Sequence, residues 1–187
     1  MSYVSRGGIK LDHALTHFGV DVGGLICADL GCSTGGFTDC LLQRGAAKVC
    51  AVDTGYGVLD YRLRKDTRVV VMERTNAMHV QLPEPVDLVT IDAGWTRQRH
   101  ILPRARLLLR GAGIRPAGIV IPLLKPHYEA ERKDLRDGIL PDDRLEPILA
   151  QIRTDIAAAG FELIDQTISP IKGQKGNTEY LALLRPR

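Results

Sequence analysis

Short, nearly uninterrupted apolar runs recur along this chain, and most of them end at a charged or polar residue. They predict strands over residues 25–30, 48–52, 68–72, 86–91 and 118–124. Runs of this kind are typical of parallel strands that are buried on both faces of a sheet. Two closing strands are expected over residues 161–168 and 178–184.

Segments with helical periodicity lie between these runs. Leu11, Ala14, Leu15 and Phe18 share one face of a short helix that Gly19 ends. Further helices are expected over residues 37–44, 101–110 and 147–159, the last with Pro147 in its first turn. This alternation predicts an α/β, Rossmann-like fold, in which a mostly parallel, seven-stranded sheet carries helices on both faces.

Length and composition favour one ordinary globular domain. The 187 residues are enough for a sizeable core, and no apolar run is long enough for a transmembrane helix. Residues 1–8 lack the layout of a signal peptide, so we expect a cytoplasmic protein. Cys27 and Cys50 lie in apolar runs and are expected to be small buried hydrophobes, and the cysteine spacing does not predict a metal site.

Open α/β sheets bind ligands beyond the carboxyl ends of their strands, and a glycine-rich loop follows the first expected strand. Its candidate cofactor-binding residues are Gly31, Ser33, Thr34, Gly35, Gly36 and Phe37. Asp53, 24 residues after Asp29, ends the next strand, where a carboxylate can accept hydrogen bonds from both ribose hydroxyls of an adenosine. The loop lacks the middle glycine of a dinucleotide site and the Lys of a phosphate-binding loop. It looks instead like the first motif of methyltransferases, although a glycine turn needed only for packing is the alternative.

Four dispersed ionisable residues, Lys10, Asp92, Lys125 and Glu179, are expected to converge near this loop. Taken singly, each has a structural explanation, such as a solvated surface charge or a turn cap. Lys125, however, ends the apolar run Ile119–Leu124, and burying an ammonium group costs free energy unless it is paired.

Local charge is more informative than the net charge of +3. Between residues 93 and 116 the chain has six arginines and no acidic residue. Clustered cations are typical of a phosphate-rich partner, but the leucines 107–109 show that this segment also packs, and both interpretations remain open.

Several ordered motifs together resemble the TlyA family of hemolysin-like rRNA methyltransferases, which are related to FtsJ/RrmJ-type ribose 2′-O-methyltransferases. The similarity extends from Tyr3 to Leu184, and its motifs lie at residues 5–11, 31–42, 73–76, 124–129 and 169–177. The resemblance implies a methyltransferase fold, S-adenosyl-L-methionine as cofactor and a ribose 2′-hydroxyl of ribosomal RNA, in a ribosomal subunit, as substrate. It also assigns the family's catalytic Lys-Asp-Lys-Glu set to Lys10, Asp92, Lys125 and Glu179, and it includes Asn76 among the cofactor-binding residues.

The expected chemistry is in-line transfer of a methyl group to a hydroxyl, which requires close alignment of oxygen, methyl and sulfur. We expect Lys125 to accept or steer the hydroxyl proton, with a pKa lowered by partial burial and by the neighbouring Lys10. Asp92 would orient Lys125 and border the methionine end of the cofactor. Glu179 would hold the lysines and contact the ribose.

Five cations are candidates for contacts with RNA: Arg6, Arg97, Arg99, Lys172 and Lys175. Lys172 and Lys175 lie in a glycine-rich loop where they can meet phosphates, although a plain surface loop has the same composition.

The chain departs from the family in two places. It begins almost where the family's catalytic domain does, so we expect a single FtsJ-like catalytic domain over residues 1–187 without the N-terminal RNA-binding domain. Residues 93–99 also differ from the more apolar family segment, and Trp95 either stacks on a base or packs on the core.

Two other functions are compatible with parts of this pattern. One is a non-catalytic protein that binds S-adenosylmethionine or RNA, which would not need Lys10 and Lys125. The other is a small-molecule methyltransferase, which would need a further lid or substrate domain. The sequence does not indicate the oligomeric state.

Overall fold

The computed structural model describes residues 2–94, 96–111 and 118–187 of the chain. Seven strands form one sheet in the order β3-β2-β1-β4-β5-β7-β6. The strands are β1 (Ile26–Leu30), β2 (Lys48–Val52), β3 (Val69–Met72), β4 (Leu88–Ile91), β5 (Ile119–Leu124), β6 (Phe161–Ile168) and β7 (Tyr180–Pro186). The first five are parallel, whereas β7 pairs antiparallel with both β5 and β6. The expected α/β fold with a mostly parallel seven-stranded sheet is thus confirmed.

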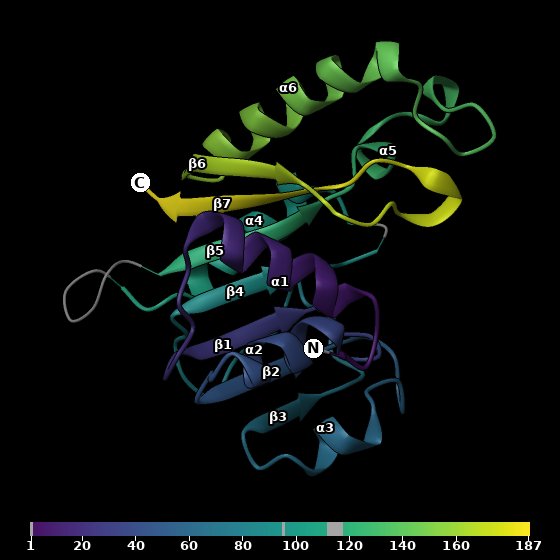
Figure 1. Cartoon of the computed structure of the whole chain (residues 1–187). Coiled ribbons are helices and arrows are strands. Elements are labelled where there is room, and N and C mark those ends of the chain that lie inside the picture. Colours follow the sequence, from purple (N-terminus) through teal and green to yellow (C-terminus); the bar gives the residue numbers. More distant parts are fainter. Residues whose placement is uncertain (1, 95, 112–117) are drawn as a thin grey trace.

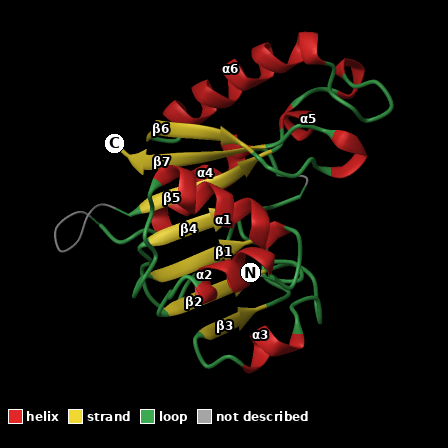
Figure 2. Cartoon of the chain, viewed as in Figure 1, coloured by secondary structure: helices red, strands yellow, loops and turns green. Residues whose placement is uncertain are grey.

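Helices cover both faces of the sheet, and Figure 1 shows α1 and α2 in front of the strands. The helices are α1 (Gly7–Phe18), α2 (Gly36–Gln43), α3 (Tyr61–Lys65), α4 (Gln98–Leu108), α5 (Pro126–Glu129) and α6 (Asp142–Ala158). Leu11 and Leu41 belong to an apolar cluster under α1 and α2, and Leu102 and Ile152 belong to a second cluster under α4 and α6. Figure 2 shows the resulting layers of helix, sheet and helix.

Strand alternation explains how one sheet supplies both clusters. Leu88 and Val89 are adjacent in β4 and completely buried, but they join different clusters because successive side chains point to opposite faces. Cys27 and Cys50 are likewise buried in separate clusters, as expected from their apolar surroundings. All four cysteines are buried free thiols.

Helix boundaries are where expectation and structure differ most. The helix expected over 147–159 begins at Asp142, so Pro147 lies inside α6 and not in its first turn. The acidic residues Asp142 and Asp143 occupy the first turn, where the helix dipole favours negative charge. The helix expected over 101–110 begins at Gln98, whose backbone N–H donates to Glu129 Oε1 at 2.7 Å. A contact distant in sequence therefore sets that start.

Candidate active site

Two adjoining cavities open at the carboxyl edge of the parallel strands. The larger, of about 480 Å³, is lined by Lys10, Asp92, Lys125 and Glu179 together with the loop after β1. The smaller, of about 370 Å³, is lined by Asp53, Asn76 and neighbouring residues. Gly31, Ser33, Asp92 and Lys125 line both cavities, so the two form one continuous site.

The glycine-rich loop lies between these cavities and the core. Gly31 and Gly35 have φ angles of 86° and 102°, a region that glycine enters without strain. A Cβ atom on Gly31 would lie 2.8 Å from the carbonyl oxygen of Asp92, and one on Gly35 would collide with Leu63. Tight packing therefore requires both glycines, and Gly31 in addition lines both cavities.

The rest of the loop divides between the cavity walls and the core. Ser33, Thr34, Gly36 and Phe37 line the larger cavity. Gly35, a candidate cofactor-binding residue, lines neither cavity, and its N–H donates to Cys32 O at 2.7 Å within the loop. The carboxyl group of Asp29, just before the loop, is completely buried. It accepts hydrogen bonds from the Thr38 hydroxyl at 2.7 Å and the Thr90 hydroxyl at 3.2 Å.

Asp53 faces the smaller cavity from the loop after β2. Its two carboxylate oxygens accept hydrogen bonds from Ser33 N at 2.9 Å and from Gly55 N at 2.7 Å. Each oxygen keeps a further lone pair for a ligand hydroxyl. Asn76 lines the same cavity, where its side-chain oxygen accepts from Met78 N at 2.9 Å. The apolar side chains of Ala77, Met78 and Ile101 complete a wall that suits a purine.

Two lysine–carboxylate pairs face the larger cavity. Lys125 Nζ lies 2.5 Å from Asp92 Oδ1, and Lys10 Nζ lies 2.5 Å from Glu179 Oε2. The side chain of Glu179 is only 4% exposed, so its pairing with Lys10 offsets the cost of burying its charge. Burial raises the pKa of Asp92, while the Lys125 ammonium acts in the opposite direction.

Four separate elements bring these groups together. Lys10 lies in the first turn of α1, Asp92 follows β4, and Lys125 follows β5 directly before Pro126 at the start of α5. Glu179 precedes β7, where its carbonyl accepts a hydrogen bond from Ser169 N at 2.9 Å. Gly173 leaves the space that the Glu179 carboxylate occupies, because a Cβ there would collide with it.

The candidate RNA contacts fall into two groups. Arg6 and Lys172 line the larger cavity. Lys175 points elsewhere, with Nζ donating to Asp137 O at 3.0 Å, and Arg97 and Arg99 line neither of the two cavities. Trp95 lies outside the described residues.

Three arginines of the arginine-rich segment have a structural role. Arg104 donates to Val80 O, Arg106 donates to Gly160 O, and Arg110 Nε lies 3.2 Å from Asp87 Oδ1. These contacts fix α4 against its surroundings and favour packing over RNA binding for these three. Arg115 lies outside the described residues.

Sequence reasoning missed several residues that shape the site. Tyr128 lines the larger cavity, and Lys125 Nζ lies 5.5 Å from the centroid of its ring. His127 is buried beside it, and burial, with the charges of Lys125 and Lys10, lowers its pKa to about 4. Both residues belong to the motif at residues 124–129, and their closeness to Lys125 in the sequence could have identified them as site residues.

Within the described residues, no group of three His, Cys, Asp or Glu side chains is arranged to hold a metal ion. No helix of that part of the chain is long and apolar enough to cross a membrane.

The sheet order, the glycine-rich loop and the carboxylate after β2 define a Rossmann-like methyltransferase. The FtsJ-like methyltransferase family matches residues 3–185, and the chain belongs to that family. Its cofactor is accordingly S-adenosylmethionine, as the first motif predicted.

Similar proteins agree with this family. Hemolysin A of Brachyspira hyodysenteriae is 43% identical over 97% of this chain and 76% of its own length. The 16S/23S rRNA (cytidine-2′-O)-methyltransferase TlyA of Mycobacterium tuberculosis is 42% identical over 98% of this chain and 69% of its own length. A solved structure described as "Putative hemolysin from Streptococcus thermophilus" has a TM-score of 0.93 and 37% identity, and the match covers all of this chain and 68% of that one. The resemblance drawn from the motifs is confirmed. The chain spans 65 to 76% of the length of the first curated relatives.

Proposed function

We propose that this protein transfers the methyl group of S-adenosylmethionine to a ribose 2′-hydroxyl of ribosomal RNA. The observation that carries the proposal is the pair of lysine–carboxylate contacts, Lys125–Asp92 and Lys10–Glu179, which face one cavity beside the cofactor loop. The names of the TlyA relatives, which act on cytidine 2′-hydroxyls of rRNA, support this substrate class.

The smaller cavity is the proposed site for the adenosine part of the cofactor. Asp53 would accept hydrogen bonds from the ribose hydroxyls, and Asn76 would border the purine among the apolar side chains. Gly31, Ser33 and Asp92, which line both cavities, would border the methionine part. The cofactor would supply an electrophilic methyl group, and Asp92, which lines both cavities, would border the part of the cofactor that carries it.

Lys125 is the proposed partner of the attacking hydroxyl. Transfer forms an O–CH₃ bond, breaks the S–CH₃ bond and releases the hydroxyl proton, which must leave the oxygen as the bond forms. Lys125 is placed to steer or accept that proton, since it faces the cavity and Asp92 fixes its amino group. Alignment of the hydroxyl with the methyl group supplies the remaining acceleration.

Lys10 and Glu179 are proposed to hold the acceptor ribose. This proposal is supported by the 2.5 Å contact between Lys10 Nζ and Glu179 Oε2 and by the place of both residues in the lining of the larger cavity. Arg6 and Lys172, at the same cavity, are proposed to contact the flanking phosphates.

Residues 1–187 are proposed to act as one FtsJ-like catalytic domain, because the family match extends over residues 3–185. A ribosomal substrate favours a cytoplasmic location.

Transfer of a tritiated methyl group from S-adenosylmethionine to unmethylated ribosomal subunits tests the function. We expect label in the rRNA and one nucleotide that resists alkaline cleavage, since a 2′-O-methyl group removes the attacking hydroxyl. Lys125→Met should lower the transfer rate at least 100-fold, a typical loss for a group acting on the transferred proton, while the variant still binds the cofactor. Lys133→Met, at a lysine whose side chain is 78% exposed, is the matched control. Cofactor binding without label in RNA, or full activity of Lys125→Met, would refute the proposal.

A further inference from the structure

Two exposed tyrosines lie beside the cofactor loop, and none of the residues discussed so far explains them. Tyr56, in the loop after β2, is 72% exposed, and Tyr61, in the first turn of α3, is 66% exposed. Each ring carries a cation on one face. Arg74 Cζ lies 4.1 Å from the centroid of Tyr56, and Lys65 Nζ lies 4.5 Å from the centroid of Tyr61.

Some of the described cations around these rings are paired with carboxylates and others are not. Residues 56–74 include five cations and three carboxylates. Arg62, Arg64 and Arg68 pair with Asp60, Glu73 and Asp66 respectively. Within the described residues, Lys65 and Arg74 make no salt bridge and lie on the tyrosines instead. The two cations that remain available to an anion are therefore those that accompany an exposed aromatic face.

The backbone under this surface is fixed to the site. Glu73 accepts hydrogen bonds from Gly57 N at 2.9 Å and Val58 N at 3.0 Å, and its carboxylate also contacts Arg64. Asp60 N donates to Thr34 O of the cofactor loop at 3.0 Å, and Arg74 N donates to Gly55 O at 3.0 Å. The backbone that carries the tyrosines is thus tied to the site, so less backbone entropy is lost when a ligand stacks on their rings.

We propose that Tyr56, Tyr61, Lys65 and Arg74, here called the β3-edge surface, bind single-stranded RNA that flanks the methylated nucleotide. An aromatic face stacks a base of any identity, and an adjacent cation neutralises the phosphate, which is the usual design of single-strand binding surfaces. The inference rests on the proposed function, because it assigns part of that RNA to this surface.

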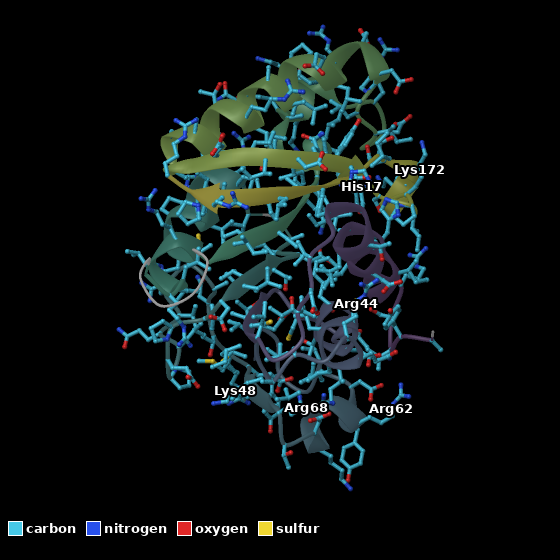
Figure 3. The ribbon with its side chains drawn as sticks, turned by 60° about the vertical axis from the view of Figure 1, so that its left-hand side comes forward. His17, Arg44, Lys48, Arg62, Arg68 and Lys172 are labelled. Atoms are coloured by element: carbon cyan, nitrogen blue, oxygen red, sulfur yellow. The ribbon has the colours of Figure 1, made fainter. Side chains whose placement is uncertain are left out.

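Sheet order sets how far this contact lies from the chemistry. Four strand spacings of about 4.8 Å, or roughly 19 Å across the sheet, separate β3 from β5, the strand that Lys125 follows. Figure 3 shows Arg62, next to Tyr61 in α3, toward the opposite end of the molecule from Lys172. The surface therefore contacts neighbouring nucleotides and not the methylated one, and the RNA extends across the carboxyl edge of the sheet.

Equilibrium binding of an unmethylated rRNA fragment, followed by fluorescence anisotropy, tests the proposal. We expect Tyr56→Ala and Tyr61→Ala each to raise the Kd for RNA about tenfold, from the loss of one stacked base. Tyr56→Phe and Tyr61→Phe should keep wild-type affinity, since the ring remains. Lys65→Ser and Arg74→Ser should each reduce the slope of log Kd against log salt by about 0.7. Arg144→Ser, at an exposed position in α6, is the charge-matched control and should leave the slope unchanged.

Methylation of two RNA lengths separates this inference from the proposed function. With a long fragment, Tyr56→Ala/Tyr61→Ala should lower kcat/KM, whereas with a fragment trimmed to the target nucleotide and its immediate neighbours it should match the wild type. Cofactor affinity should be unchanged in every variant. If the wild-type protein methylates the long fragment and the double variant does so equally well, the β3-edge surface does not bind RNA. Its tyrosines would then belong to a contact with another protein. If the wild-type protein neither binds nor methylates either fragment, the proposed function itself fails.

Discussion

Asp29 shows how one side chain links the fold to the pH of the solution. Burial raises the pKa of its carboxyl group to about 7, while hydrogen bonds from Thr38 and Thr90 act in the opposite direction and nearby Asp92 adds to the increase. In the unfolded chain the same group titrates near 3.8. The folded protein therefore binds one more proton than the unfolded chain between about pH 4 and pH 7.

We expect Asp29 to make the protein less stable as the pH rises through this window. Because the folded-state pKa is the higher one, its contribution is complete below about pH 4 and is lost as the pH passes 7, a change on the order of a few kcal/mol. Asp29→Asn should remove most of this dependence, which urea denaturation between pH 4 and pH 8 measures. Asp143→Asn, at an exposed position of α6, controls for the loss of a charge. An equal slope for wild type and Asp29→Asn would contradict the prediction.

At the scale of structural elements, neighbouring side chains constrain the loop from β1 to α2. Gly35 has a φ of 102° and faces Leu59 and Leu63, so its conformation and its surroundings both exclude a side chain. Gly24 has a φ of 72°, but an added Cβ would meet no atom within 4 Å. Comparing a substitution at Gly24 with one at Gly35 therefore separates the cost of backbone strain from the cost of a steric collision.

Gly35→Ala should therefore destabilise the protein more than Gly24→Ala. Backbone strain alone costs on the order of 1–3 kcal/mol, and the collision with Leu63 adds to it only at position 35. Calorimetric titration should also show weaker cofactor binding for Gly35→Ala alone, since the loop that carries Gly35 borders the site and Gly24 lines neither cavity. Equal stability and equal affinity of the two variants would mean that the loop shifts without penalty.

At the scale of the whole molecule, the sheet joins two apolar clusters that no single helix spans. Leu11, from α1, is buried in one cluster, and Leu102, from α4, is buried in the other. The strands supply side chains to both clusters, so loss of either one removes support from the same sheet.

We expect Leu11→Ala and Leu102→Ala each to lower the free energy of unfolding by about 2–5 kcal/mol. If residues 1–187 form one domain, each variant should keep a single transition in urea, with calorimetric and van't Hoff enthalpies in agreement. Leu107→Ala, at a leucine of α4 that is 74% exposed, is the control and should have little effect. A second transition in either variant would indicate two independent domains.

The sequence by itself determined most of the fold and the residue types of the site. Lys48–Val52 and Phe161–Ile168 were located with their exact bounds because apolar periodicity is a local property. The motifs also determined the family, since their order along the chain is specific. The start of α6 was misplaced because Pro147 is tolerated inside that helix, which the local pattern does not reveal.

The resemblance to the family already led us to expect Asp92 beside Lys125 and Glu179 beside the lysines, but only the tertiary structure gives these contacts their geometry. They depend on four elements converging at one edge of the sheet, and the partner of Lys10 is 169 residues away. Arg104, Arg106 and Arg110 likewise have structural partners that lie far from them in the sequence. The physical reason is that periodicity and turn chemistry act between near neighbours, whereas ion pairs and burial depend on which strands the sheet brings side by side.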